Sequence, residues 1–241
     1  LADRSPEEIE FVVIRENTEG EYSGAGGNAH RGLPHEVAVE TAVFSRMAIE
    51  RVVRYAFALA ERRDRSLVSA TKSNAQQHGM TLWDEVVEGV AADHTEVTVE
   101  RVLIDALAAR FVLKPDSLDV VVASNLFGDI LTDLGAAICG SLGIAPSGNI
   151  NPEGDYPSMF EPVHGSAPDI VGRGVANPLG MIRTGAMMLE HLGEGGPAEL
   201  IEGAVRAFTS AGASFTPDLG GTTGTAEVTD EVVRRMEEEA G

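Results

Sequence analysis

The stretch from Asp119 to Asp133, DVVVASNLFGDILTD, constrains the fold of this chain more than any other. It opens with a continuous apolar run rich in valine, which predicts a buried strand, and it continues with the apolar spacing of a helix. Asp129 and Asp133 are four residues apart, so they lie on one face of that helix. The stretch therefore predicts a strand that runs directly into a helix carrying two carboxylates.

A third acid, Asp105, ends the upstream apolar run VTVERVLID. Three convergent carboxylates would suit a hard divalent cation such as Mg²⁺ or Mn²⁺. Two aspartates at helical spacing are also common on a solvated helix face. Here, however, apolar residues flank both acids, and acids in apolar surroundings need a partner. Metal-assisted chemistry on an anionic substrate is therefore the leading hypothesis from the residues alone.

Apolar strands and amphipathic helices alternate along the first half of the chain. Strands are expected at EFVVIRE, SLVSAT, TVERVLI and DVVVA, with helices at 45–63, at 76–92 and shortly before residue 111. The apolar face of the first helix is expected to contain Met47, Val52, Ala56, Phe57 and Ala60. This alternation indicates an α/β fold built on an open sheet.

The glycine-rich segment from Asn17 to Gly32 interrupts this pattern and is expected to form an arm, followed by an extended piece at 37–44. After Cys139 the composition changes, and residues 140–157, rich in Gly, Pro, Ser and Asn, are expected to form a loop. A strand at PSMFEPV, helices at 177–191 and 197–211, and a final helix capped by Thr225 or Thr229 follow. We therefore expect one domain at 1–138, including the arm, and another at 139–241.

Composition excludes several classes of function. With 241 residues, 43% of them hydrophobic, the chain can bury a sizeable core. No apolar stretch is long enough to span a bilayer and no secretory signal precedes the first strand, so we expect a cytoplasmic protein. The net charge of −20 disfavours nucleic acid and acidic membranes as partners. The single cysteine excludes an intramolecular disulfide framework and a multi-cysteine zinc site.

Separate motifs along the chain occur in a distinctive order. They are VIRENTEGEYSG at 13–24, TKSNA at 71–75, the acid of LIDA at Asp105, NLFGDILTD at 125–133, EPVHGSAPDI at 161–170, GVANP at 174–178 and TPDLGG at 216–221. The set resembles the β-decarboxylating dehydrogenases, the family of isopropylmalate, isocitrate, homoisocitrate and tartrate/D-malate dehydrogenases, and the resemblance covers the whole chain. The two segments ENTEGEYSGAGG and KSNAQQHGM are most similar to the tartrate/D-malate branch of this family.

The resemblance implies an isopropylmalate dehydrogenase-like two-domain α/β fold. Residues 1–138 would form the smaller domain for substrate, metal and dimer contacts, and residues 139–241 would form the C-terminal part of the large cofactor-binding domain. The resemblance further implies that Asp105, Asp129 and Asp133 are the metal ligands, for Mg²⁺ or Mn²⁺. By the same matching, Arg15 would grip a substrate carboxylate with its planar guanidinium, while Tyr22 and Lys72 would transfer protons. The implied reaction is oxidation of a (2R)-hydroxy diacid such as D-malate or tartrate, followed by loss of CO₂.

The resemblance also implies that the segment HGSAPDIVGRGVANP binds a nicotinamide cofactor. The expected contacts are His164, Gly165, Ser166, Ala167, Pro168, Asp169, Ile170 and Asn177. Asp169 would lie near the adenine ribose, where an acid favours the free 2'-hydroxyl of NAD and repels the phosphate of NADP. NAD is therefore the expected cofactor.

Two features of the resemblance concern what lies outside a single copy of this chain. The family's first strand, its glycine-containing turn and an arginine-bearing segment have no counterpart here, so we expect about one small domain's worth of residues to be missing before Leu1. Family members work as dimers, which implies a homodimer in which Lys72 and Asp105 enter the partner's site. Isopropylmalate and isocitrate remain alternative substrates, and a non-catalytic subunit or truncated remnant is the alternative of another class.

Overall fold

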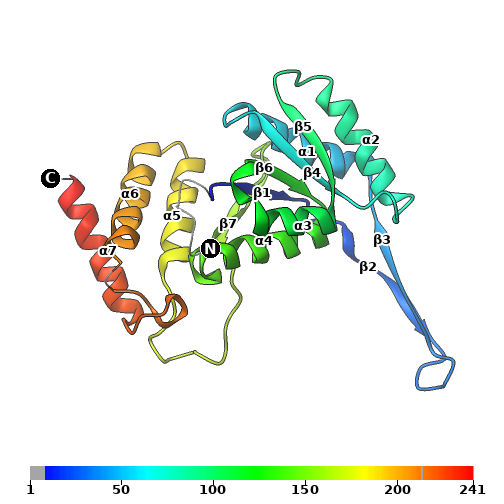
Figure 1. Ribbon diagram of the computed structural model, residues 1–241. Coiled ribbons are helices and arrows are strands. Elements are labelled where there is room, and N and C mark those ends of the chain that lie inside the picture. The colour runs from blue at the N-terminus through cyan, green and yellow to red at the C-terminus, as the bar shows by residue number, and fades with distance from the viewer. Residues whose placement is uncertain (1–8, 213, 241) are drawn as a thin grey trace. The chain divides into compact units, whose positions relative to one another are not determined.

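The computed structural model describes residues 9–212 and 214–240 of the chain, which divides after Gly135 into two compact units (Figure 1). The predicted domain boundary at 138/139 lies a few residues later, inside helix α4 (Asn125–Cys139). The predicted roles of the two parts as domains stay predictions. No helix in the described part of the chain is long and apolar enough to cross a membrane.

The first unit contains a parallel sheet of four strands in the order β1-β6-β4-β5. These strands are β1 (Val12–Arg15), β6 (Val120–Ala123), β4 (Ser66–Thr71) and β5 (Thr98–Leu103). All three pairings are parallel, with Arg15 level with Ala123 and Thr71 level with Leu103. The predicted α/β fold with an open sheet is confirmed, and the sheet is parallel.

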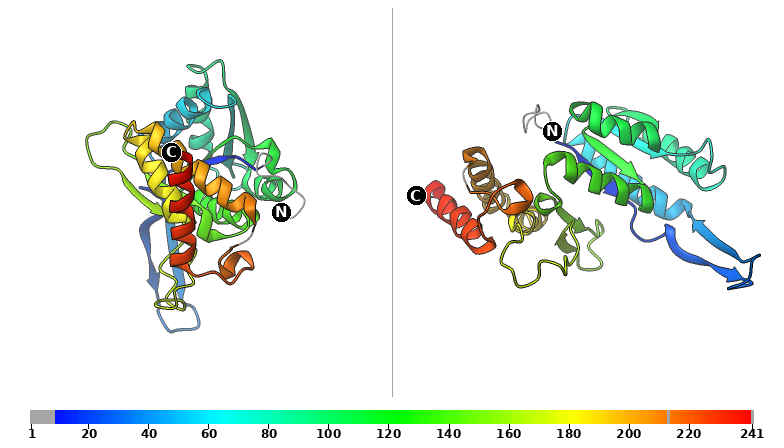
Figure 2. Two further views of the ribbon diagram at one scale, coloured as in Figure 1. Left: turned by 90° about the vertical axis from the view of Figure 1, so that its left-hand side faces the viewer. Right: turned by 60° about the horizontal axis from the view of Figure 1, so that its bottom comes forward.

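Helices cover both faces of this sheet, as the views of Figures 1 and 2 show. Helices α1 (Arg46–Glu61) and α2 (Gly79–Ala91) lie on one face, and α3 (Ile104–Leu113) and α4 lie on the other. This arrangement follows from right-handed crossovers, because the chain moves outward from β4 to β5 and then back to β6. The core between the layers is built from fully buried side chains such as Phe57, Trp83 and Phe111.

The spacing of apolar residues predicted helix α1 and only part of its buried face. Ser45 caps the helix, accepting a hydrogen bond from the Ala48 backbone nitrogen at 3.2 Å. Ala56, Phe57 and Ala60 are buried as predicted. Val52 is only partly buried and Met47 is 78% exposed, because the buried stripe begins instead at Ala48 and Ile49 and continues through Val53.

The predicted arm is a β-hairpin that projects from the first unit (Figure 1). Strands β2 (Gly20–Ala29) and β3 (Val37–Val43) pair in the antiparallel direction and belong to no other sheet. Most of the glycine-rich segment from Asn17 to Gly32 is therefore strand, although glycine is poor in strands. Every residue of β3 is exposed.

The second unit combines a small sheet with three helices. Strands β7 (Pro146–Asn149) and β8 (Met159–Pro162) pair antiparallel next to α5 (Leu179–His191), which packs on α6 (Gly195–Ala211), and α6 packs on α7 (Thr225–Ala240). Residues 140–157 are therefore not entirely loop, since they include β7 and a short 3₁₀ turn at Leu142–Ile144. The core of this unit consists of Leu179, Ala204, Val205, Phe208, Val228 and Val232.

Candidate active site

The predicted catalytic side chains of the first unit come from one edge of its parallel sheet. Arg15 ends β1, Lys72 follows β4, Asp105 lies just beyond the end of β5, and Asp129 lies near the start of α4, which follows β6. The carboxyl ends of parallel strands meet at one edge, where open α/β sheets bind their ligands. The topology therefore collects these separate segments of sequence at the edge expected of an active site.

Arg15 is fixed by two partners from α4. Its Nε and Nη2 atoms both donate to the Asn125 side-chain oxygen, at 3.1 and 2.7 Å, and its Nη1 donates to Asp129 Oδ1 at 2.6 Å. Gly128 makes this approach possible, because a Cβ there would lie within 2.8 Å of the Arg15 side chain. The guanidinium is thereby held in one orientation at the sheet edge.

Tyr22 reaches the same carboxylate from the arm. Its hydroxyl donates to Asp129 Oδ2 at 3.1 Å, and the Arg15 guanidinium carbon lies 5.7 Å from the centre of its ring. The hydrogen bond to Asp129 raises the pKa of the Tyr22 hydroxyl, a shift that Arg15 opposes. Asp129 therefore joins the predicted substrate-binding arginine to the predicted proton-transferring tyrosine.

Lys72 and Asp105 form a second pair at the same sheet edge. Lys72 Nζ donates to Asp105 Oδ1 at 2.5 Å, and this hydrogen bond holds the pKa of Asp105 below its ordinary value. The lysine side chain is 27% exposed and the aspartate 67%. Both side chains therefore lie at a surface that a substrate or a second protein chain can reach.

The predicted metal ligands do not come together within one chain. Among the described residues, no group of three or more His, Cys, Asp or Glu side chains is arranged to hold a metal ion. Asp129 and Asp133 share the exposed side of α4, whereas their apolar neighbours Phe127 and Leu131 turn into the core. The apolar sequence around the two acids therefore reflects the opposite face of the helix and does not bury the carboxylates. The prediction that Asp105 joins the same ion from a second copy of the chain stays a prediction.

The predicted cofactor segment of the second unit is an open turn. His164, Gly165, Ser166, Ala167, Pro168 and Asp169 are exposed, and Ile170 is half-buried. The backbone is held by turns, with Ile170 N donating to Ala167 O at 3.1 Å, and Ala167 takes a positive φ of 42°. Among the described residues, no side chain of the segment 164–170 has a hydrogen bond to another part of the second unit. The His164 ring faces the carbonyl of the neighbouring Gly165 at 3.0 Å.

Asn177 differs from the rest of the predicted cofactor set because it is buried. Its amide nitrogen donates to Asp218 Oδ2 at 2.9 Å, and its oxygen accepts from the Leu179 backbone nitrogen at 3.0 Å. Ser141 also donates to Asp218 Oδ2. Asn177 thus supports the start of α5, and its predicted contact with adenosine remains a prediction.

Comparison with known proteins identifies the family of the chain. Residues 1–232 match the family described as isocitrate/isopropylmalate dehydrogenase. The chain belongs to this family. A probable tartrate dehydrogenase/decarboxylase of Bacillus subtilis is 55% identical over 231 residues, and the decarboxylating D-malate dehydrogenase of Escherichia coli is 50% identical over 239 residues.

A solved structure agrees with the fold of this family member. The crystal structure of isocitrate dehydrogenase from Methylococcus capsulatus superposes with a TM-score of 0.87 at 39% identity, covering 94% of this chain and 67% of that one. The B. subtilis and E. coli relatives are matched over 96% and 97% of this chain but over only 65% and 66% of their own lengths. The chain therefore spans about two thirds of the length of its relatives.

Three residues of this family member's sheet edge were not predicted from sequence. Asn125 and Gly128 lie inside the motif NLFGDILTD, and Glu21 lies inside VIRENTEGEYSG. The available signal was a polar residue, Asn125, directly after a buried strand, where a side chain 4% exposed needs a partner. Nothing local distinguishes Glu21 from the other glutamates of its segment.

Proposed function

We propose that the protein oxidises and decarboxylates a (2R)-hydroxy dicarboxylic acid, D-malate or tartrate, with hydride transfer to NAD and dependence on Mg²⁺ or Mn²⁺. The observation that carries the proposal is the joint bonding of Asp129 by Arg15 and Tyr22. It collects a carboxylate-binding arginine, a proton donor and a metal-type ligand in one place. The names of the B. subtilis and E. coli relatives favour these two substrates over isopropylmalate and isocitrate.

Arg15 is suited to bind one carboxylate of the diacid. Its Nε and Nη2 stay on Asn125, while Nη1, which bonds Asp129, has a second N–H that it can donate to a substrate oxygen. A planar guanidinium held from one side presents its remaining donors in a fixed direction. This positioning would lower the entropy lost when the substrate binds.

Proton transfers in the proposed reaction fall to Lys72 and Tyr22. Lys72 would accept the proton of the substrate's C2 hydroxyl, directly or through water, as hydride leaves C2 for NAD. After CO₂ departs, Tyr22 would donate a proton to the neighbouring carbon. Asp129 holds the tyrosine protonated, since its negative charge and hydrogen bond raise the pKa of the hydroxyl. A protonated phenol is the form that this second transfer needs.

The proposed metal ligands have the right chemistry for the implied cation. Asp129 and Asp133 supply carboxylate oxygens one helical turn apart, and Asp105 would be supplied by a second copy. When bound, Mg²⁺ or Mn²⁺ would supply Lewis-acid stabilisation of negative charge on substrate oxygens. Asp133 carries its charge at the exposed side of the helix, where an ion can reach it.

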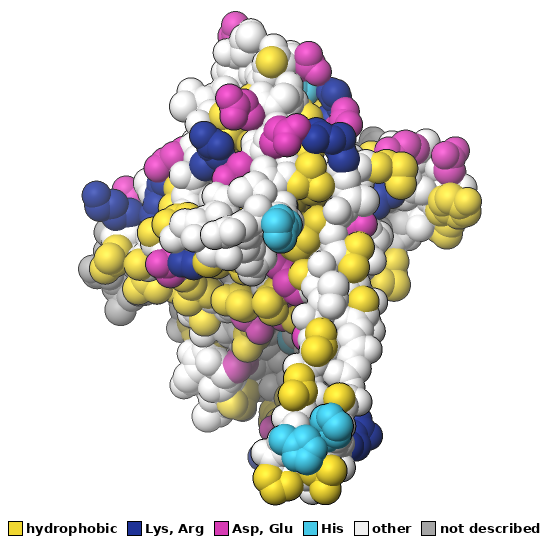
Figure 3. All heavy atoms as spheres, turned by 90° about the vertical axis from the view of Figure 1, so that its right-hand side faces the viewer, with side chains coloured by type: hydrophobic (Ala, Val, Ile, Leu, Met, Phe, Trp, Pro, Cys, Tyr) yellow, Lys and Arg dark blue, Asp and Glu magenta, His cyan; other side chains and the backbone are white. Residues whose placement is uncertain are grey.

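A homodimer would complete this site. The arm is exposed over most of its length and carries apolar side chains, with Val37, Val39 and Val43 at 52%, 55% and 44% exposure (Figure 3). A long exposed hairpin with apolar side chains is suited to pairing with another copy. If sedimentation shows a monomer at all concentrations, Lys72 and Asp105 cannot enter a partner's site, and their proposed roles would be contradicted.

The open turn at 164–170 would bind the adenosine part of NAD, with Asp169 selecting against the 2'-phosphate of NADP. Its exposed backbone and side chains leave room for a ligand. Asn177 would contribute from the buried end of the segment. The small side chains of Gly165, Ser166 and Ala167 allow close approach of a flat adenine ring.

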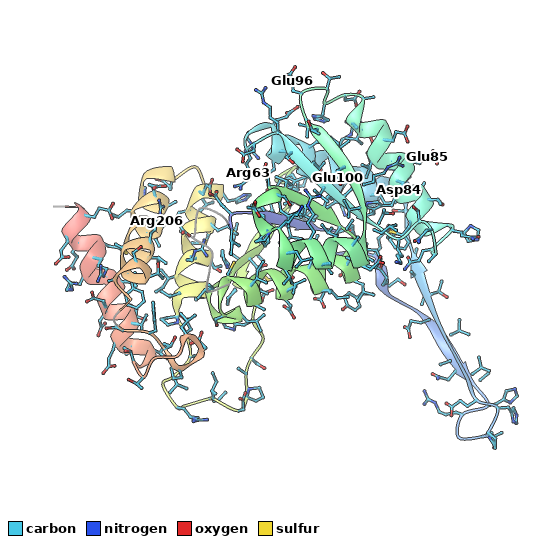
Figure 4. The ribbon with its side chains drawn as sticks, viewed as in Figure 1. Arg63, Asp84, Glu85, Glu96, Glu100 and Arg206 are labelled. Carbon is cyan, nitrogen blue, oxygen red and sulfur yellow. The ribbon has the colours of Figure 1, made fainter. Side chains whose placement is uncertain are left out.

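NADH production with D-malate or tartrate and Mn²⁺ tests the proposed function. The chain and any longer product of its gene should be assayed, with isopropylmalate and isocitrate as competing substrates. Asp129→Asn and Lys72→Ala should each lower the rate at least about 100-fold, the loss expected when a metal ligand or a proton-transfer group is removed. Glu96→Gln is a matched control, because Glu96 lies before β5, at the opposite end of that strand from Asp105 (Figure 4). Full activity in either active-site variant would refute the assigned roles.

A further inference from the structure

The arm contains an irregularity directly beside the proposed active site. Its strands pair at Gly20 with Val43, and the next pair is Ala25 with Thr41. Residues 21–24 of β2 therefore lie opposite residue 42 alone, and the ladder does not hold them. Gly20 permits the change of direction, because its φ is +78°. Bulges of this kind redirect side chains, and this one contains Tyr22.

Glu21 anchors this bulge to the first turn of α4. Its Oε1 accepts from the Ser124 hydroxyl at 2.8 Å, and its Oε2 accepts from the Leu126 backbone nitrogen at 3.2 Å. The first backbone N–H groups of a helix have no partner within the helix, so a carboxylate there is favourable. Ser124 is 1% exposed, which makes this end of the anchor part of the buried structure.

The neighbouring residue, Tyr22, bonds the same helix one turn further on, at Asp129. On the opposite side of the bulge, the Ser23 hydroxyl donates to the Thr41 carbonyl of β3 at 2.7 Å. The bulge is thus tied to α4 through Glu21 and to β3 through Ser23, with Tyr22 between them. Tyr22 is 54% exposed, so packing alone does not define where its hydroxyl lies.

We propose that Glu21 is a positioning residue, which holds the Tyr22 hydroxyl on the Asp129 carboxylate by fixing the bulge to α4. The proposal rests on the proposed function, in which Tyr22 transfers a proton, and it assigns Glu21 no contact with substrate. Its effect on the reaction passes through Tyr22. A glutamate that only capped α4 would instead affect the protein equally whether or not Tyr22 has its hydroxyl.

A double-mutant cycle separates these two roles. Glu21→Ala should lower kcat about tenfold in the protein that has Tyr22, with a smaller change in KM, and less than about threefold in a Tyr22→Phe background. Equal losses in the two backgrounds would overturn the proposal. Glu21→Gln should restore most of the rate, because its amide can accept from Leu126 and donate to Ser124. Should Glu21→Ala fail to fold, Ser124→Ala removes one of the same bonds and should show the same dependence on Tyr22.

A measurement that needs no activity keeps this proposal distinct from the proposed function. The chain contains three tyrosines, so ¹³C-tyrosine labelling gives few signals, and Tyr22→Phe identifies the one from Tyr22. Glu21→Ala should move the Tyr22 signal by more than its linewidth and leave those of Tyr55 and Tyr156 in place, and Glu21→Gln should return it. An unmoved Tyr22 signal would overturn the positioning role even in an active enzyme. A moved signal in a protein inactive on D-malate and tartrate would refute only the proposed function.

Discussion

The sheet edge around Asp129 and the open turn at 164–170 would bind the two reactants, but the chain supports them in different ways. At the sheet edge, side chains hold one another, since Asn125 and Asp129 together fix the Arg15 guanidinium and Asp129 receives Tyr22. In the open turn, backbone hydrogen bonds set the shape and the side chains are exposed. The groups that would react are therefore pre-organised, while those that would only bind are left for the ligand to order.

The largest loss of activity is expected when Arg15, at the centre of the pre-organised sheet edge, is replaced. Arg15→Ala should cost about 100-fold or more in kcat/KM for the diacid, because it removes a substrate ligand and leaves the buried Asn125 oxygen unpaired. Arg15→Lys should recover little, since an ammonium cannot reproduce the planar fork. Steady-state kinetics of the two variants measures this. Arg46→Ala, which breaks an exposed ion pair with Glu85, is the control for loss of an arginine. A loss in kcat/KM below about threefold in Arg15→Ala would mean that the sheet edge is no more pre-organised than the open turn.

Changes in the open turn should alter binding without affecting the chemical step. Asp169→Ser should improve kcat/KM for NADP relative to NAD by about tenfold, because it removes the charge that would repel the 2'-phosphate. The change should appear in the KM of the cofactor and leave kcat with saturating NAD within about twofold. Asp155→Ser removes another exposed acid of the second unit and should leave the preference unchanged. A fall in kcat in Asp169→Ser alone would show that the turn is as pre-organised as the sheet edge.

The hydrogen bonds of Asp218 are expected to contribute to the stability of the second unit. Asp218 accepts from Ser141 and from the buried Asn177. Partial burial alone would raise the pKa of Asp218, but these hydrogen bonds outweigh it and hold the pKa below its ordinary value. Asp218→Ala should therefore lower the free energy of unfolding by about 1 kcal/mol at neutral pH.

The pH dependence of that loss has a definite sign. Since the folded pKa of Asp218 lies below the unfolded value, its ionised form stabilises the protein above the unfolded value, and this contribution is lost as pH falls through the folded pKa. The difference between the native chain and Asp218→Ala should thus be constant near neutrality and shrink in strong acid. Urea unfolding over that range measures it. A difference that grew on acidification would contradict the lowered pKa.

Local pattern was sufficient to predict the elements that carry the site. The apolar run before Asn125 and the spacing after it predicted β6 and α4, because strand and helix periods are properties of neighbouring residues. The same pattern misjudged the surroundings of Asp129 and Asp133, since a list of flanking residues does not separate the two faces of a helix. Their side chains lie on the solvent side, and Phe127 and Leu131 fill the core.

Contacts between distant segments could not be predicted in this way. Glu21 bonds Ser124 across 103 positions of sequence, and the bulge that it anchors depends on this contact. Strand β7 was missed for a similar reason, because its proline and glycine are unfavourable in strands and its support comes from pairing with β8 and packing on α5. The absence of a three-ligand group among the described residues of one chain agrees with the family resemblance, which places Asp105 in the partner's site, and no local pattern of residues indicates it.

The smallest expected effect concerns the backbone of the open turn. Ala167 has a φ of 42°, a backbone conformation that is unfavourable for any residue with a side chain. Its methyl group is exposed, so it gains little packing energy to offset this cost. Ala167→Gly should therefore raise the free energy of unfolding by about 0.5 kcal/mol. Ala207→Gly, at an exposed position inside α6 of the same unit, should instead lower it by about 1 kcal/mol. Opposite signs in urea unfolding would show that the turn stores backbone strain, whereas destabilisation by both substitutions would mean that the turn is relaxed without its ligand.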